Sequence, residues 1–264
     1  MNIFVRELKA NLKSLIIWGV IVILFVVVAV SKFSAYYNNP EMLAILDAMP
    51  EAMMAAFSLN AFNLTMISGF FGVMFTYFAL LLSIAATMWG SDVISKEERD
   101  KTVEFSLTLP VTRSRLVTAK TLAALVNCIG LLLITWGASL VSVAQYQPGS
   151  EFYQFLRLCM VALFIMQLIF LAIGIFLGCA MKRYKRAGAV AIALLLGTYF
   201  LSVISGLHKD LEFLKYFSPF KYFDAGLLLR EARLDGTFVL LSLAIIVASM
   251  VGAYLTYSRR DLYI

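Results

Sequence analysis

The chain has 264 residues, of which 62% are hydrophobic and 14% are charged, and its mean hydropathy is +0.88. Because soluble domains are only about half apolar, this composition excludes a soluble globular protein and places the chain in a lipid bilayer. The net charge of +6 does not indicate a nucleic-acid partner, since the basic residues form short stretches between apolar runs.

Residues 1–14 are predicted to form an interfacial elbow helix in the lipid headgroup region. An apolar stripe at helical spacing faces away from the basic residues: Phe4, Leu8, Leu12 and Leu15 against Arg6, Lys9 and Lys13. Basic residues ahead of the apolar run 15–30 also fit a cleaved signal peptide. We expect the run to be retained as the first transmembrane helix.

Six apolar runs are close to the roughly 20 residues that a helix needs to cross a bilayer. They cover residues 15–36, 64–90, 116–144, 156–181, 187–207 and 237–257. The whole chain, 1–264, is therefore predicted to be a single transmembrane domain with six spans.

Lysine and arginine predict which side of the membrane each connection faces. Three precede the first span, five lie in 91–115, four in 182–186 and two after the last span. The alternate segments are poor in them except 208–236, where five are balanced by five acidic residues. We therefore expect both termini, 91–115 and 182–186 in the cytoplasm. The outer segments 34–63 and 208–236 are expected to form short amphipathic helices against the outer leaflet.

Small residues recur every four positions in three spans, which allows helices to approach closely. They are Gly174 and Gly178 in span four, Ala189, Ala193 and Gly197 in span five, and Ala244, Ala248 and Gly252 in span six. These rows serve either packing within one chain or an interface between two subunits.

The chain lacks the residue patterns that ATP binding, proton coupling or catalysis requires. It has no glycine-rich phosphate loop ending in Gly-Lys-Ser or Gly-Lys-Thr, no C-x-x-C pair and no Asp or Glu inside a span. Its one histidine, His208, lies at the outer end of span five. We expect no catalytic, cofactor or metal site in this chain.

Two residue groups leave alternatives open. Four outer methionines are either soft copper ligands or flexible apolar contacts with lipid: Met42, Met49, Met53 and Met54. Three polar residues in spans either converge in the wet pocket of a membrane-embedded enzyme or hydrogen-bond between helices: Asn127, Ser139 and Gln167.

The most informative connection is 91–115, whose first half is charged. Ser95 and Glu98 match a capping box, and Glu97 with Lys101 forms a favourable i,i+4 pair. This half is predicted to be a helix that extends span two.

The second half of this connection begins after Thr102 and alternates apolar with polar residues. Pro110 ends the alternating stretch, and Thr112 is placed to cap span three. A lone strand has no visible partner here. The stretch is either a short helix that presents apolar groups to another protein or an ordinary surface loop.

This connection resembles the stretch between spans two and three of permease subunits of type 2 ABC exporters, the ABC-2 family. The matching residues are Glu98, Lys101-Thr102-Val103-Glu104-Phe105, Leu107, Leu109-Pro110-Val111-Thr112-Arg113-Ser114-Arg115 and Lys120. Weaker similarity is found at Ser218-Pro219-Phe220-Lys221-Tyr222-Phe223 and at Arg259-Arg260-Asp261-Leu262.

The resemblance implies a cytoplasmic coupling helix between spans two and three that docks on a separate ATP-binding subunit. The residues expected to contact that subunit are Thr102, Val103, Glu104, Phe105, Leu107 and Pro110, with Glu98 and Arg113 fixing the orientation of the segment. ATP and Mg would then be bound by the partner and not by this chain. The family also implies two ATPase and two permease subunits, the second permease expected to be another copy of this chain.

The resulting expectation is an all-α membrane protein with six transmembrane helices, an N-terminal interfacial helix, a cytoplasmic coupling helix and short outer amphipathic helices. It is expected to lie in the cell membrane, a bacterial cytoplasmic membrane, as the permease of an ATP-driven exporter of amphipathic, peptide-like, drug-like or lipid-like molecules. The alternative is a stand-alone secondary transporter or channel, which more often carries intramembrane ionisable groups or internal repeats.

Overall fold

A computed structural model describes residues 3–37, 39, 48, 50, 62–99, 112–181, 184–207 and 209–259. Six long helices dominate this part: α1 (Ile3–Tyr36), α4 (Ile67–Arg99), α6 (Arg113–Val143), α7 (Ser150–Ala180), α8 (Tyr184–Ser205) and α10 (Gly236–Arg259). Each is long and apolar enough to cross a membrane. The prediction of an all-α membrane protein with six spans is confirmed.

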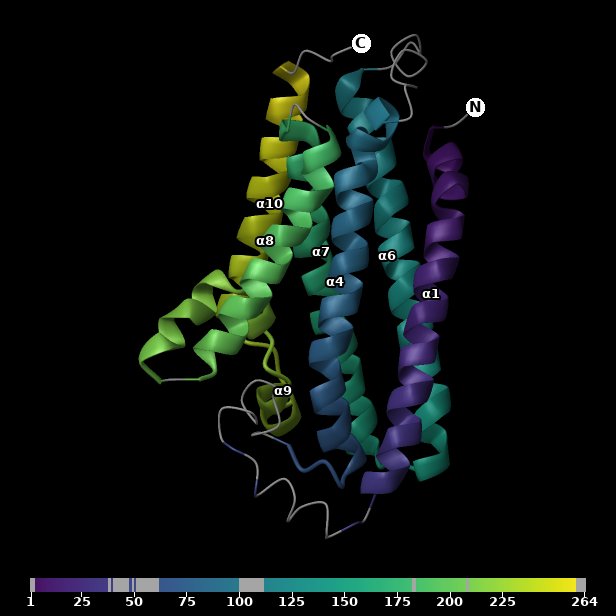
Figure 1. The fold of residues 1–264 in the computed structure, drawn as a ribbon, viewed down its shortest axis with the longest axis vertical. Helices are drawn as coiled ribbons and strands as arrows, with labels where there is room; N and C mark the ends of the chain where they lie inside the picture. The colour runs from purple at the N-terminus through teal and green to yellow at the C-terminus, as the bar shows by residue number, and fades with distance from the viewer. Residues whose placement is uncertain are drawn as a thin grey trace.

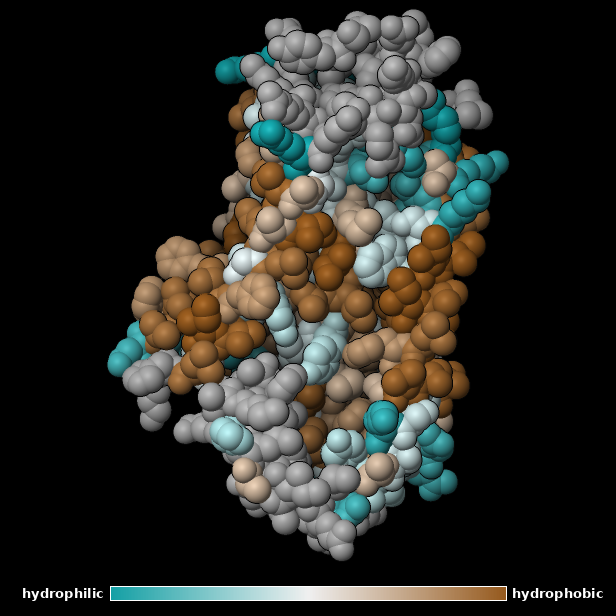
Figure 2. Space-filling view, viewed as in Figure 1, coloured by the Kyte–Doolittle hydropathy of each residue, from teal (hydrophilic) through white to brown (hydrophobic). Residues whose placement is uncertain are grey.

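The helices form an elongated bundle with two distinct ends (Figure 1). At the end that we call the terminal end, α1 begins, α4 ends, α6 begins and α10 ends. At the opposite, distal end, α1 ends, α4 begins, and α6 is followed by α7. On the face shown in Figure 2, apolar side chains predominate at the middle of the bundle, with hydrophilic side chains toward both ends. This is the surface expected of a protein surrounded by lipid at mid-height.

Helices α4 and α7 form the centre of the bundle. In their most apolar windows 56% and 61% of the residues are buried, against 22% in α1 and 11% in α10. Helix α1 packs mainly on α6, α8 packs on α4, and α10 packs on α7. The four outer helices therefore surround a central pair that runs in the same direction, from the distal to the terminal end.

Glycines allow the backbones of α4 and α7 to touch. A Cβ atom at Gly174 would lie 2.7 Å from the carbonyl oxygen of Thr87, and one at Gly178 would lie 2.7 Å from that of Ser91. On the α4 side, a Cβ at Gly90 would collide with the carbonyl oxygen of Leu171. The small residues of span four thus serve packing within one chain, which was one of the two alternatives that the sequence left open.

The small residues of the last two spans face outward instead. Ala189, Ala193 and Gly197 of α8 are exposed, as are Ala244 and Ala248 of α10. Gly252 differs, because a Cβ there would lie 2.8 Å from a ring carbon of Phe176.

Helices α1 and α4 extend furthest beyond the spans that their apolar runs predict. Residues 3–36 form one continuous helix, so no separate elbow helix precedes span one. The segment before Ser14 pairs with α4 and α6 through Glu7. Helix α4 continues to Arg99, and the prediction that the charged residues extend span two is confirmed over this length. Ser95 lies inside the helix and its hydroxyl bonds the carbonyl of Ser91, so the predicted capping box is wrong.

The connection between α8 and α10 folds into short helices, η2 (Lys209–Phe217), η3 (Pro219–Lys221) and α9 (Ala225–Glu231). Its η2 part projects beside α8, whereas α9 packs against α4 and α7 (Figure 1). The buried Ser218 hydroxyl donates to the Thr198 carbonyl at 2.7 Å, which fixes the connection to α8. Within η2 the hydrogen bond from Lys215 to Glu212, at 2.7 Å, lowers the pKa of the Glu212 carboxyl.

Candidate functional site at the terminal ends of α1, α4 and α6

The sequence points to the connection between α4 and α6 as the functional segment. Of its eight predicted site residues, six lie outside the described residues: Thr102, Val103, Glu104, Phe105, Leu107 and Pro110. Glu98 belongs to the last turn of α4, and Arg113 is the first residue of α6. The structure therefore defines the two helix ends between which residues 100–111 are held.

Arg113 attaches the start of α6 to the last turns of α10. Its Nη1 donates a hydrogen bond to the Tyr257 carbonyl at 3.3 Å, and its guanidinium carbon lies 5.8 Å from the centre of the Tyr257 ring. One turn further, the hydroxyls of Thr118 and Tyr254 are 2.8 Å apart. These contacts join α6 to α10, and the expected role of Arg113 in orienting the segment before α6 stays a prediction.

Thr112 caps α6, as the sequence predicts. Its backbone is extended, and its side-chain oxygen accepts a hydrogen bond from the amide of Arg115 at 3.3 Å. The cap satisfies a backbone donor that has no partner within the helix. It also fixes the residue at which the connection ends and the helix begins.

Replacing Thr112 by alanine is expected to lower the free energy of unfolding by about 1 kcal/mol, because the first turn of α6 loses this acceptor. The melting temperature of the purified chain in detergent should fall by roughly 2–4 °C. Thr112→Ser retains the hydroxyl and should melt like the original chain. Equal melting of the alanine and serine variants would show that the cap contributes nothing.

A cluster of charged side chains joins the other helix ends. The Glu7 carboxylate of α1 lies 3.8 Å from the Lys96 ammonium of α4 and 4.0 Å from the Lys120 ammonium of α6. Lys120 is 1% exposed and also donates to the Val93 carbonyl at 2.8 Å. Asn11 completes the cluster, since its amide oxygen accepts from Lys96 at 3.1 Å and its amide nitrogen donates to Glu7 at 3.4 Å.

A second polar contact between α1 and α4 lies two turns along α1. The indole nitrogen of Trp89 donates to the hydroxyl of Ser14 at 2.9 Å. Glu7, Asn11 and Ser14 are spaced as one face of a helix, and all three bond α4. Sequence reasoning noted the basic residues of this segment and missed this polar face, although its i, i+4, i+7 spacing was visible.

The described residues hold no group of three His, Cys, Asp or Glu side chains arranged to bind a metal ion. The four outer methionines and His208 lie outside the described residues. Gln167 of α7 donates to the Cys128 carbonyl of α6 at 3.3 Å, an interhelical hydrogen bond at the level of Asn127. Ser139 lies 11 residues beyond Cys128, about 16 Å along α6, so these polar residues do not converge in one pocket.

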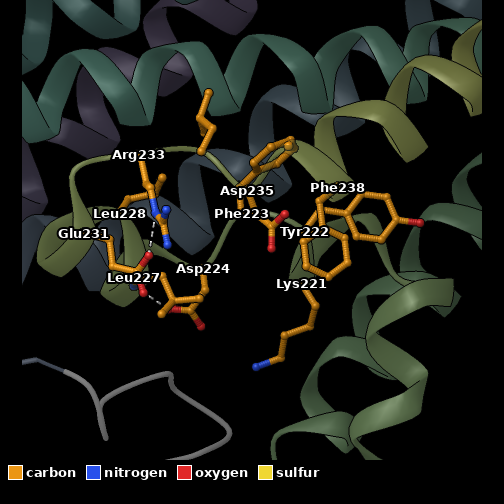
Figure 3. Close-up of a pocket in the computed structure, with 12 residues that line it drawn as sticks. Lys221, Tyr222, Phe223, Asp224, Leu227, Leu228, Glu231, Arg233, Asp235 and Phe238 are labelled. Carbon is orange, nitrogen blue, oxygen red and sulfur yellow. Dashed lines mark hydrogen bonds and ion pairs between the residues drawn. The ribbon is translucent and has the colours of Figure 1, made fainter.

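A cavity of about 310 Å³ lies at the distal side, between the short helices and the start of α10 (Figure 3). Its acidic residues have structural partners: Asp224 caps α9, Asp235 accepts from the amide of Thr237, and Glu231 pairs with Arg233 at 2.8 Å. Tyr222 and Phe238 stack with ring centres 5.2 Å apart. These contacts stabilise the connection and present no nucleophile or general base in a catalytic arrangement.

Comparison with known families gives one match that covers nearly the whole chain. The model of the family described as "ABC-2 family transporter protein" matches residues 1–262. No curated protein matches the chain.

Proposed function

This chain belongs to the ABC-2 family of transporter proteins, and we propose that it is the permease subunit of an ATP-driven exporter whose ATP is hydrolysed by a separate subunit. ATP and Mg are bound by that subunit. In the proposed transporter two ATPase subunits serve two permease subunits, and the second permease is another copy of this chain.

The observation that carries the proposal is the way the two helix ends around residues 100–111 are held. Helix α4 continues as far as Arg99, and α6 starts at Arg113 with a side-chain cap. One end is bonded to α1 and the other to α10. A partner that pushes on the segment between them acts on four helices at once. This supports residues 102–110 as the docking site, with Phe105 as its central apolar residue.

The proposed orientation places the terminal end in the cytoplasm of a bacterial cell. The basic residues that flank the spans support it, because 14 of the 22 lysines and arginines belong to the segments at this end. An ATPase in the cytoplasm then has direct access to residues 100–111.

The proposed cargo is amphipathic, peptide-like, drug-like or lipid-like. Its support is the apolar character of the helices: the spans contain no Asp or Glu, and large apolar side chains line the exposed faces of α1, α8 and α10. A path between two copies of such a bundle suits an apolar or amphipathic molecule better than a small ion.

The test is native mass spectrometry of the tagged chain, purified in mild detergent from its own organism. We expect two copies of the chain with two copies of an ATPase subunit that carries a phosphate-binding loop. Deletion of residues 102–109 should release the ATPase while the chain stays in the membrane. Isolation of the chain without an ATPase, under conditions that preserve a known ABC complex, would favour a stand-alone transporter or channel.

Phe105→Ala tests the same site with one residue. Loss of a central interface aromatic costs about 2 kcal/mol, which corresponds to roughly 30-fold weaker binding of the ATPase. Val141→Ala is the matched control, because Val141 is a highly exposed apolar residue at the distal end. Equal ATPase affinity in the two variants would remove Phe105 from the docking site.

A further inference from the structure

One carboxylate connects three helices at the terminal end. Glu7 lies in α1, Lys96 near the end of α4 and Lys120 in the second turn of α6, and both ammonium groups face the same carboxylate. The Glu7 side chain is 10% exposed and that of Lys120 is 1% exposed.

Burial makes this arrangement difficult to separate. A buried ammonium or carboxylate is tolerated when it is paired, and it is strongly unfavourable when its partner leaves. If α1 moved away from α4 and α6, Lys120 would keep its bond to the Val93 carbonyl but lose the Glu7 carboxylate. The three helix ends should therefore move together and not slide past one another.

The remaining contacts of α1 give this connection a mechanical role. Along its length α1 packs mainly on α6, where Gly19 lies against Ile134 and Leu15 against Gly130. It contacts α4 through the polar face of Glu7, Asn11 and Ser14 at the terminal end, and through aromatic ring pairs further along the helix. The polar face therefore ties the terminal end of α1 to α4, and much of the remaining surface of α1 is exposed and apolar.

We propose that Glu7 is a positioning residue, an ionic lock that joins the terminal ends of α1, α4 and α6 into one unit. This part of the inference does not depend on the proposed function. Its consequence for transport rests on the proposed function: a displacement of residues 100–111 by the ATPase is delivered to α1 as well as to α4 and α6. Without the lock, the first turns of α1 lose this tie, while the packing of α1 on α6 beyond Leu15 remains.

The first experiment uses the isolated chain in lipid nanodiscs. Nitroxide labels on cysteines placed at Leu12 of α1 and Leu122 of α6, which are 51% and 48% exposed, report the distance between the helices by double electron–electron resonance. The three native cysteines are buried and are replaced by alanine if they take up label. We expect a single narrow distance in the original chain and a clearly broader distribution in Glu7→Gln.

Lysine variants separate the charge from the fold. Lys96→Gln should broaden the distribution, whereas Lys96→Arg, which retains the charge, should keep it narrow. Lys13→Gln removes an exposed α1 lysine outside the cluster and should change nothing. If Glu7→Gln does not fold, the comparison of Lys96→Gln with Lys96→Arg provides the test. Lys96 is partly exposed, so its substitution disturbs the fold less. A narrow, unshifted distribution in both Glu7→Gln and Lys96→Gln would overturn the lock.

The second experiment repeats the measurement in the complex with the ATPase, before and after trapping with ATP and vanadate. The distance between α1 and α6 should be the same in both states of the original complex and should change on trapping in Glu7→Gln. A change of equal size in the original complex would overturn the role in transmission. If no ATPase binds to the chain but Glu7→Gln still broadens the distance, the proposed function fails and the lock stands.

Discussion

Replacing Gly174 by alanine is expected to lower the stability of the folded protein strongly. A Cβ atom at this position would lie 2.7 Å from the Thr87 carbonyl oxygen and 3.0 Å from the Ser91 nitrogen, and both atoms belong to the backbone of α4. Backbone atoms cannot change rotamer, so α4 and α7 must separate along their whole contact. Overpacking of a core usually costs 1–3 kcal/mol, and we expect about 3 kcal/mol here.

Gly137→Ala provides the matched control. Gly137 also lies in the middle of a long helix, but a Cβ added there meets no atom within 4 Å. Alanine is a better helix former than glycine by about 1 kcal/mol, so this variant should be as stable as the original chain or more stable. The two variants are compared by heating them and measuring, by fluorescence-detected size-exclusion chromatography, the fraction of each that remains monodisperse. Equal stability would contradict the close contact of α4 and α7.

Removal of the buried ammonium at Lys120 is the second substitution with a large expected effect. Lys120→Ala deletes a 1% exposed side chain together with its hydrogen bond to the Val93 carbonyl and its pairing with Glu7. Breaking a buried ion pair by removing one partner costs about 3 kcal/mol or more. The free energy of unfolding in detergent should fall by that amount.

Lys120→Met separates the two causes of this loss. Methionine has nearly the length of lysine and restores packing but not charge, so it should recover only part of the stability. Lys96→Met removes the more exposed ammonium of the cluster and should cost less than Lys120→Met, because a partly exposed pair is screened by water. If Lys120→Met were as stable as the original chain, the ammonium would not stabilise the fold.

Periodicity and length alone predicted most of the fold. Each of the six apolar runs coincides with one of the six long helices to within three residues or extends less far than the helix, and Thr112 caps α6 as its position before the third span predicted. These features depend on local rules, namely the length of helix that crosses a bilayer and the side chains that bond a helix start. The glycines of span four were also visible, but their partner helix was not, since nothing in the local sequence says that Gly174 meets α4.

The site was predicted less completely, for a physical reason. The sequence directed attention to residues 91–115, yet the contacts that hold both ends of this segment come from Glu7 and Tyr257, 85 or more residues away. Lys120 belongs to the residues that resemble the ABC-2 family. Its pairing could not be predicted, because the sequence around a lysine in an apolar run does not say which carboxylate lies beside it in the fold. The predicted contacts of Thr102 to Pro110 with an ATPase remain a prediction, because these residues lie outside those described.

The parallel arrangement of α4 and α7 constrains how the protein is made. Two helices that run in the same direction through a bundle cannot be consecutive spans, and α6 lies between them in the chain. The ribosome therefore synthesises about 80 residues after Gly90 before Gly174 exists, which at usual rates takes roughly 4–16 s. During that interval α4 is in the membrane without the helix that will cover its glycine and its small polar side chains. Final closure of the bundle core must await the fourth span, so early chaperone or translocon contacts of a nascent chain should concentrate on α4.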